Sequence, residues 1–298
     1  MRSPAVLNSH VAAATAIPAT ENLGVIAAVV LAALLHAAWN GAAHHIPDRA
    51  VGLALIGVAY TVISAAVVPF VAVPDAGAWG WLLGSVALQV VYNLLLIRSY
   101  RLGAFSQVYP LARGVSPMVV VAAVTVTGQP LPTGQTLGVA VLCAGLMVLV
   151  FAGGSVVHTG RDAVTAAILT GLCIATYTVL DGMGIRAAHS TAGYIAWLFL
   201  LQGPILPAII TIQRRCRILH DCRLVWRLGL TSGVGSLAAY GIVLWAQTRT
   251  NLATVAALRE LSILFGAVIG PVFFREKFGT WRIIGAALAV AGIALLNI

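Results

Sequence analysis

The sequence predicts an all-α polytopic membrane protein in which ten transmembrane helices form two inverted five-helix repeats. Three observations support this fold class: a very apolar composition, the number of apolar segments, and residue matches between the two halves. Of the 298 residues, 60% are hydrophobic and 8% are charged, whereas soluble globular proteins carry roughly 25% charged residues. The mean hydropathy of +1.00 also places the chain in a membrane.

Hydropathy and chain-breaking residues define the predicted elements in order. Residues 1–22 are polar and alanine-rich and lack the features of a signal peptide, so we expect a disordered N-terminal tail. The predicted spans are 23–43, 50–73, 78–98, 104–127, 134–152, 162–186, 192–213, 225–248, 252–274 and 279–297. Each span needs about 20 apolar residues, which leaves no room for a soluble catalytic domain.

Residue matches between the halves indicate an internal repeat. The pairs found at one constant offset are Ser85/Ser232, Gln89/Ser236, Asn93/Tyr240, Gly138/Gly285 and Gly145/Gly292. In the same register, Arg113 falls on Glu260. A half with five spans enters and leaves the membrane on opposite sides, so two copies in tandem are inverted. We therefore expect one repeat over 23–152 and a second over 162–298.

Charged residues interrupt two of the apolar spans. Arg113 lies between Pro110 and Pro117, which are expected to weaken the helix, and the pair Arg259 and Glu260 interrupts the ninth span. Such groups are costly in a bilayer and by default mark a polar interior or a pathway. Arg113 is a candidate substrate contact, because its rigid fork matches carboxylates and phosphates. The alternative is an intramembrane ion pair between Arg113 and Glu260, and the two roles are compatible.

Polar and aromatic residues at helical spacing predict stripes that face a central polar cavity. The residues expected to bind a solute are Arg113, Tyr109, Trp39, Asn40, Asn93, Tyr177 and Tyr240. The residues expected to serve in coupling or in an ion pair are Glu260, Arg259 and His36. His36 is interpreted either as a proton carrier or as an interhelical hydrogen-bond partner. Asp181 is expected near the end of its span, where water solvates it.

No catalytic residue, metal site or cofactor is expected. The sequence has no Gly-x-Ser-x-Gly elbow, His-Glu-x-x-His helix or Walker loop. Cys216 and Cys222 flank His220 in a basic segment, but their spacing does not match a standard zinc site. An intramembrane enzyme and a sensor or assembly subunit are the alternatives to a transporter, and both lack their usual parts.

Several short motifs follow one another along the two halves of the chain. They are 36–40 (HAAWN), 101–104 (RLGA), 274–278 (FREKF) and the glycines Gly285 and Gly292. Over residues 24–297 the chain resembles the drug/metabolite transporter superfamily, specifically its EamA-like family. The segment 128–131 departs from the family pattern, which commonly has an acidic residue there, as Glu276 provides in the second half. The resemblance implies secondary active export or exchange of small metabolites, amino acids or amphipathic compounds, without ATP hydrolysis.

The expected partners follow from the charge distribution and the resemblance. They are a small-molecule solute and the lipid bilayer, with a coupling proton and a homodimer as further options. Nucleic acid is not expected despite a formal charge of +9, because the cations lie mainly between the apolar segments. The expected location is the plasma membrane. The charge distribution favours both termini outside the cytoplasm, whereas the resemblance implies both termini inside.

Overall fold

The chain folds into a bundle of α-helices. The computed structural model describes residues 19–102, 105–126, 132–152, 160–214, 217–265 and 279–296. The helices are α2 (Ala19–His44), α3 (Arg49–Val67), α4 (Trp79–Leu102), α5 (Phe105–Val126), α6 (Thr133–Ala152), α7 (Arg161–Ala187), α8 (Thr191–Gln202), α9 (Ile205–Arg214), α10 (Arg217–Gln247), α11 (Leu252–Arg259) and α13 (Thr280–Leu296). Short 3-10 turns cover Val68–Phe70 and Ala76–Ala78. The described residues form no strand, which confirms the all-α class.

Six segments of the described chain are long and apolar enough to cross a membrane. They are Leu23–Ala43, Arg49–Phe70, Ala76–Ser99, Arg161–Ala187, Thr191–Arg214 and Asp221–Gln247. Shorter apolar helices cover Leu111–Ala123, Thr133–Leu149 and Ile283–Leu295. The chain is therefore a multi-pass membrane protein. Most of the predicted N-terminal tail lies outside the described residues, and α2 begins at Ala19.

Helices α5, α8, α9 and α10 differ from what the sequence predicts. Helix α10 begins at Arg217, eight residues before the predicted 225, in a basic segment where four of the eight added residues are arginine or leucine, which are good helix formers. The predicted seventh span is divided into α8 and α9 at Gly203 and Pro204. Helix α5 instead runs without a break from Phe105 to Val126, through both prolines.

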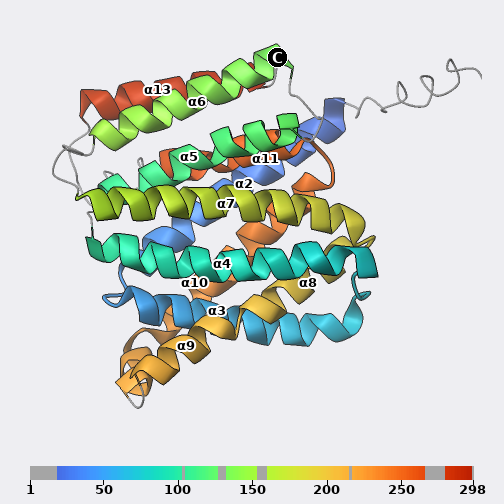
Figure 1. Cartoon of the computed structure of the whole chain (residues 1–298), viewed down its shortest axis with the longest axis vertical. Helices are drawn as coiled ribbons and strands as arrows, with labels where there is room; N and C mark the ends of the chain where they lie inside the picture. Colours follow the sequence, from blue (N-terminus) through green and yellow to red (C-terminus); the bar gives the residue numbers. More distant parts are fainter. Residues whose placement is uncertain are drawn as a thin grey trace, which may run out of the picture.

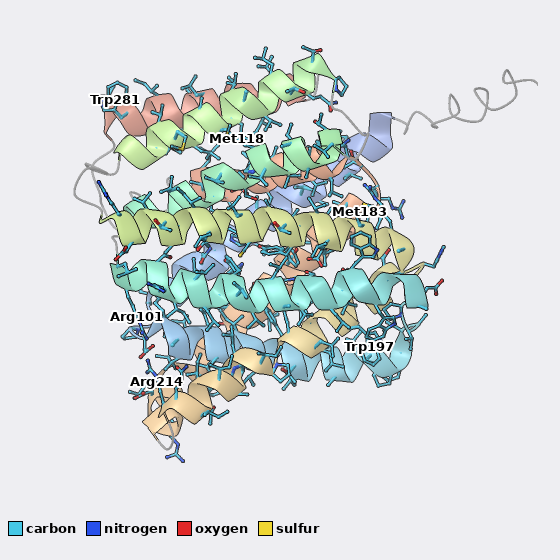
Figure 2. All side chains as sticks on the ribbon, viewed as in Figure 1. Arg101, Met118, Met183, Trp197, Arg214 and Trp281 are labelled. Carbon is cyan, nitrogen blue, oxygen red and sulfur yellow. The ribbon has the colours of Figure 1, made fainter. Side chains whose placement is uncertain are left out.

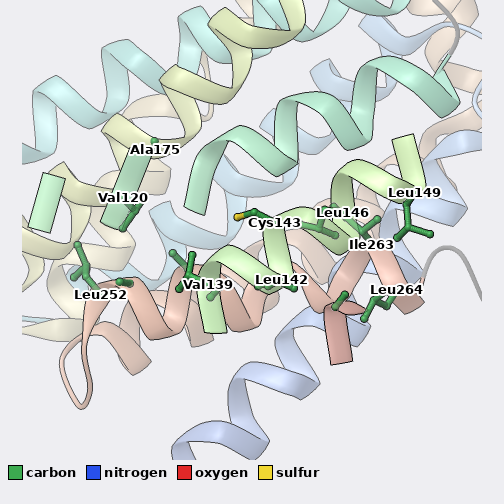
Figure 3. Close-up of a cluster of buried hydrophobic side chains, with 14 residues drawn as sticks. Val120, Val139, Leu142, Cys143, Leu146, Leu149, Ala175, Leu252, Ile263 and Leu264 are labelled. Carbon is green, nitrogen blue, oxygen red and sulfur yellow. The ribbon is translucent and has the colours of Figure 1, made fainter. Parts of the chain in front are cut away.

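The helices pack side by side, with α6 and α13 together at one edge and α9 at the opposite edge (Figure 1). The largest apolar cluster joins α6 to α5, α7, α11 and α13 (Figure 3). Its members include Leu142 and Leu146 of α6, Val120 of α5 and Ala289 of α13. This cluster lies between the edge pair and the rest of the bundle.

Glycines let α6 and α13 approach closely. A Cβ atom on Gly145 would lie 2.6 Å from the backbone nitrogen of Ala289 and 2.7 Å from the carbonyl oxygen of Gly285. A Cβ atom on Gly292 would lie 2.7 Å from the carbonyl oxygen of Gly138. The two glycine pairs that match between the halves in sequence therefore meet each other across one helix contact.

The interruption of α11 positions the two charged residues of the ninth predicted span. Helix α11 ends at Arg259, and the N–H of Glu260 donates to the carbonyl oxygens of Ala257 and Leu258. The N–H of Ile263 donates to the carbonyl oxygen of Glu260 at 3.0 Å, and helical structure resumes at residue 261. Tight turns of this kind inside a helix often mark functional positions.

Candidate functional site

Side chains from both halves of the chain enclose a cavity of about 140 Å³ in the bundle interior. Its polar, charged and aromatic lining residues are His36, Trp39, Asn40, Arg49, Tyr60, Gln89, Tyr92, Asn93, Arg113, Tyr177, Phe199, Gln202, Ser236, Tyr240 and Arg259. The described lining includes three arginines and no aspartate or glutamate. The cavity wall is therefore positively charged and rich in aromatic rings.

Arg113 is held by a residue from the other half of the chain. Its Nε lies 3.1 Å from Oε2 of Glu260, and its Nη2 donates to Oγ of Ser262 at 2.8 Å. Arg113 is 4% exposed and Glu260 is 1% exposed, so the pair is almost completely shielded from solvent. The structure thus brings together the two residues that the repeat register aligns, and only Arg113 of the two lines the cavity.

Arg259 faces the cavity in a different way. Its Nε lies 3.9 Å from Oε1 of Glu260, beyond hydrogen-bond distance. Its Cζ lies 5.9 Å from the centre of the Tyr240 ring, which is a cation–π distance. Neighbouring residues on a helix point in different directions, and these two side chains do so. Arg259 lines the cavity, whereas Glu260 contacts Arg113 and is not part of the lining.

Asp181 is placed differently from the prediction, and the expectation of a solvated position was wrong. Its side chain is completely buried, because α7 continues past it to Ala187 and helices α4, α8 and α10 surround it. The hydroxyls of Tyr194 and Tyr240 donate to its carboxylate at 3.0 and 2.6 Å. Nε2 of Gln89 donates to it at 3.4 Å. Asp181 therefore fixes the hydroxyl of Tyr240, which is a cavity residue.

Most residues of the predicted stripes line the cavity. Trp39, Asn40, Asn93, Tyr177 and Tyr240 all do so. The side chain of Tyr109 lies outside the described residues. The aromatic rings form a connected wall, because the ring of Tyr177 lies 5.7 Å from that of Tyr92 and 6.1 Å from that of Tyr240.

His36 is tied into its own helix. Nδ2 of Asn40 lies 3.1 Å from Nε2 of His36, and the imidazole makes an edge contact with the Trp39 ring at 4.9 Å. Both contacts lie within α2, so they test neither the proton-carrier interpretation nor that of an interhelical hydrogen-bond partner.

Sequence reasoning missed four lining residues: Arg49, Tyr60, Phe199 and Gln202. The hydroxyl of Tyr60 lies 2.6 Å from Oγ of Ser236, which links α3 to α10. Tyr60 and Gln202 each interrupt an apolar span with a group that needs a hydrogen-bond partner. That signal was present in the sequence and could have identified them.

Arginines concentrate at the end of the bundle toward which the cavity extends. Ala43 and Arg49, at the α2–α3 connection, line this part of the cavity, and Arg101 and Arg214 lie at the same end (Figure 2). Arg214 forms a salt bridge with Asp48, the N-cap of α3. Partial burial acts to raise the pKa of Asp48, but the hydrogen bonds from Arg214 and from the backbone outweigh it and hold that pKa below its ordinary value.

The described residues contain no group of three His, Cys, Asp or Glu side chains that could hold a metal ion. Cys222 is a free thiol. Cys216, and the side chain of His220, lie outside what the structure describes.

Part of the chain is similar to a known family. Residues 162–298 match the model of the EamA-like transporter family. The match covers the second proposed repeat and just under half of the chain. Over these residues, the match confirms the resemblance seen in the sequence motifs.

Two known proteins are also similar to this chain. A WAT1-related, chloroplastic protein of Arabidopsis thaliana is 30% identical over 67 residues, which cover 22% of this chain and 16% of that protein. The matched part is therefore a small fraction of the relative's length. A crystal structure of another protein superposes with a TM-score of 0.72 over 92% of this chain and 98% of that chain, at 16% identity. At that identity the likeness establishes the fold.

Proposed function

We propose that this EamA-like protein is a secondary active transporter that exports or exchanges small solutes by alternating access around the cavity. The observation that carries the proposal is that helices from both halves of the chain line one polar cavity inside an apolar bundle. Polar groups at membrane depth are costly and mark solute or ion pathways by default. The cavity volume of about 140 Å³ is below the roughly 300–1,000 Å³ of drug-sized sites, so it suits a small metabolite.

The helix contacts support two inverted five-helix halves. If α2 corresponds to α7, α4 to α10 and α5 to α11, then exchanging the halves converts the α4–α7 contact into α10–α2 and the α5–α7 contact into α11–α2. All four contacts occur. The α6–α13 contact converts into itself and also occurs. This pattern is what a pseudo-two-fold axis between two repeats produces, and it supports ten spans over 23–152 and 162–298.

The ion pair between Arg113 and Glu260 offers a coupling step. It joins α5 to the segment after α11, and these elements belong to opposite halves. Neither carboxylate oxygen of Glu260 accepts a hydrogen bond from the described residues, so Arg113 is its main electrostatic support. In the proposed cycle a proton binds the carboxylate of Glu260, the ion pair opens, and the halves rock relative to each other.

The proposed location is the plasma membrane, with the arginine-rich end in the cytoplasm as the positive-inside rule favours. A reporter fused after Ile298 tests this orientation. A cytoplasmic reporter would contradict it and would favour the orientation that the family resemblance implies. Cross-linking in membranes tests the proposed homodimer separately.

Flux in proteoliposomes tests the transport function. A pH gradient is imposed, and uptake is measured for a metabolite panel with wild-type protein and with Arg113→Ala and Glu260→Gln. We expect wild-type flux to follow the gradient and both variants to lose it. Arg249→Gln, which removes an exposed charge outside the cavity, is the matched control and retains flux. Folded variants that transport like wild type would overturn the site assignment.

The alternative is a sensor or assembly subunit, or an intramembrane enzyme. Binding of a solute to the purified protein with no flux for any panel member would favour the sensor. Release of a changed product from a bound solute would favour the enzyme.

A further inference from the structure

We propose that the solute is a small organic anion and that the guanidinium of Arg259 binds its oxyanion group, whether carboxylate or phosphate. The inference rests on the proposed transport function and names the class of solute that the same cavity takes. It also assigns the two arginines at the inner end of the cavity to different tasks: Arg113 to the ion pair and Arg259 to the solute.

Arg259 has donors that no described residue satisfies. The residue is 4% exposed, and its Nε and Nη2 are buried without a hydrogen-bond partner among the described residues. A buried guanidinium without hydrogen bonds is costly, because each lost bond to a charged group is worth about 1.5–3 kcal/mol. An oxyanion in the cavity satisfies both nitrogens with the bidentate geometry that guanidinium favours.

The neighbouring carboxylates are engaged elsewhere. Glu260 lies closer to Arg113 than to Arg259: its carboxylate is 3.1 Å from Nε of Arg113 and 3.9 Å from Nε of Arg259. Both oxygens of Asp181 accept hydrogen bonds from neutral donors, and no arginine among the described residues lies within salt-bridge distance of it. Neither carboxylate lines the cavity. Glu260 thus attracts Arg259 from outside the cavity lining without accepting a hydrogen bond from it, and the donors of Arg259 remain available to a solute.

Two further unsatisfied atoms line the same cavity. Nε1 of Trp39 is a buried donor, and Oε1 of Gln202 is a buried acceptor, and neither has a partner among the described residues. A solute with an oxyanion and a hydroxyl or amine group satisfies all three residues at once. Small hydroxy acids, amino acids and phosphorylated polyols have this combination of groups.

Charge also favours entry of an anion. Arg49 lines the part of the cavity nearest the arginine-rich end, whereas Arg113 and Arg259 lie deeper. Positive charges along a low-dielectric passage concentrate anions in it and exclude cations. The same arrangement opposes cationic drugs, one of the solute classes that aromatic walls would otherwise suit.

Binding of matched solute pairs to the full-length protein in lipid nanodiscs tests the proposal. The carboxylate arm compares L-lactate with lactamide, the phosphate arm compares glycerol phosphate with glycerol, and inorganic phosphate is a third probe. Calorimetry at constant ionic strength measures each Kd. We expect the anion of at least one pair to bind and its neutral match to bind at least about tenfold more weakly, since one charge-assisted hydrogen bond is worth that factor.

Variants separate a solute contact from a general charge effect. Arg259→Gln is expected to raise the anion Kd at least about tenfold, and Arg259→Lys, which keeps the charge without the fork, is expected to give an intermediate value. Arg249→Gln removes an equal charge outside the cavity and leaves Kd unchanged. Trp39→Phe gives a second reading if Arg259→Gln does not fold: it weakens anion binding by removing one donor.

Three outcomes would overturn the anion assignment: no anion of the panel binds, neutral matches bind as well as anions, or folded Arg259 variants bind anions like wild type. These outcomes are distinct from failure of the transport function. Anion binding that depends on Arg259 without flux would retain the site and reject transport. Flux of neutral or cationic solutes that is indifferent to Arg259→Gln would retain transport and reject the anion.

Discussion

The buried pair of Arg113 and Glu260 gives a prediction about stability that is independent of transport. Replacing Glu260 with glutamine leaves the guanidinium of Arg113 in a nearly solvent-free site without its carboxylate. Two unit charges 3.1 Å apart attract each other by about 5 kcal/mol at an effective dielectric constant of about 20. Removal of one partner from a buried pair typically costs about 3–5 kcal/mol. We therefore expect Glu260→Gln to lower the free energy of unfolding by about 3 kcal/mol or more.

A double-mutant cycle tests this reasoning. Arg113→Gln alone leaves Glu260 without its main electrostatic support and is expected to be similarly destabilising. The double variant leaves two neutral amides, so its loss is expected to be smaller than the sum of the two single losses by at least about 2 kcal/mol. Denaturation in mixed micelles, followed by tryptophan fluorescence, measures each value. Additive losses, or single losses below about 1 kcal/mol, would show that the pair is not a buried interaction.

Three further predictions concern other contacts. Gly145→Val is expected to destabilise the bundle by at least about 1–3 kcal/mol through overpacking, whereas Gly134→Val in the same helix, where nothing lies within 4 Å, is expected to be neutral in the same denaturation assay. Asp181→Asn is expected to cost about 1.5–3 kcal/mol by weakening charge-assisted hydrogen bonds, and an unchanged unfolding free energy would contradict its buried role. The folded pKa of Asp48 lies below its ordinary value of 3.8, so its stabilising effect is present above that pH and is lost as pH falls through the lower folded value. Asp48→Asn is expected to abolish that acid-dependent loss, measured as the difference in melting temperature between neutral and acidic pH, and Arg214→Gln is expected to reduce it.

Local composition was sufficient to predict the helical class and the membrane setting, because both depend on the length and hydropathy of short segments. The contact between Arg113 and Glu260 came from a longer-range signal, the register of two repeats. Asp181 was misjudged because its solvation depends on which helices surround it. Tyr194, which supplies one of its hydrogen bonds, lies on another helix, and no linear pattern reveals that contact.

Backbone continuity was also beyond the reach of local rules. The prolines of α5 predicted a weakened helix, yet α5 is continuous, because neighbouring helices in a bundle stabilise a segment whose own hydrogen bonds are incomplete. Conversely, no proline or glycine near Glu260 predicts the interruption of α11 at that residue. Local sequence rules also did not predict the unsatisfied donors of Arg259, since only the packed structure shows which hydrogen-bond partners an arginine lacks.

The close contact of α6 with α13 has a consequence for how much of the molecule can move. Neither helix contributes a residue to the described cavity lining, yet each forms the final helix of one proposed half. The glycines of α6 and α13 bring the backbones of the two helices into contact. Sliding of one helix along the other would therefore make main-chain atoms clash. This edge of the bundle can therefore act as a fixed pivot, with the largest displacements at the opposite edge, near α9. Fluorophores attached to α9 and α13 would measure how the distance between these helices changes during the proposed transport cycle, and neither label would contact the solute.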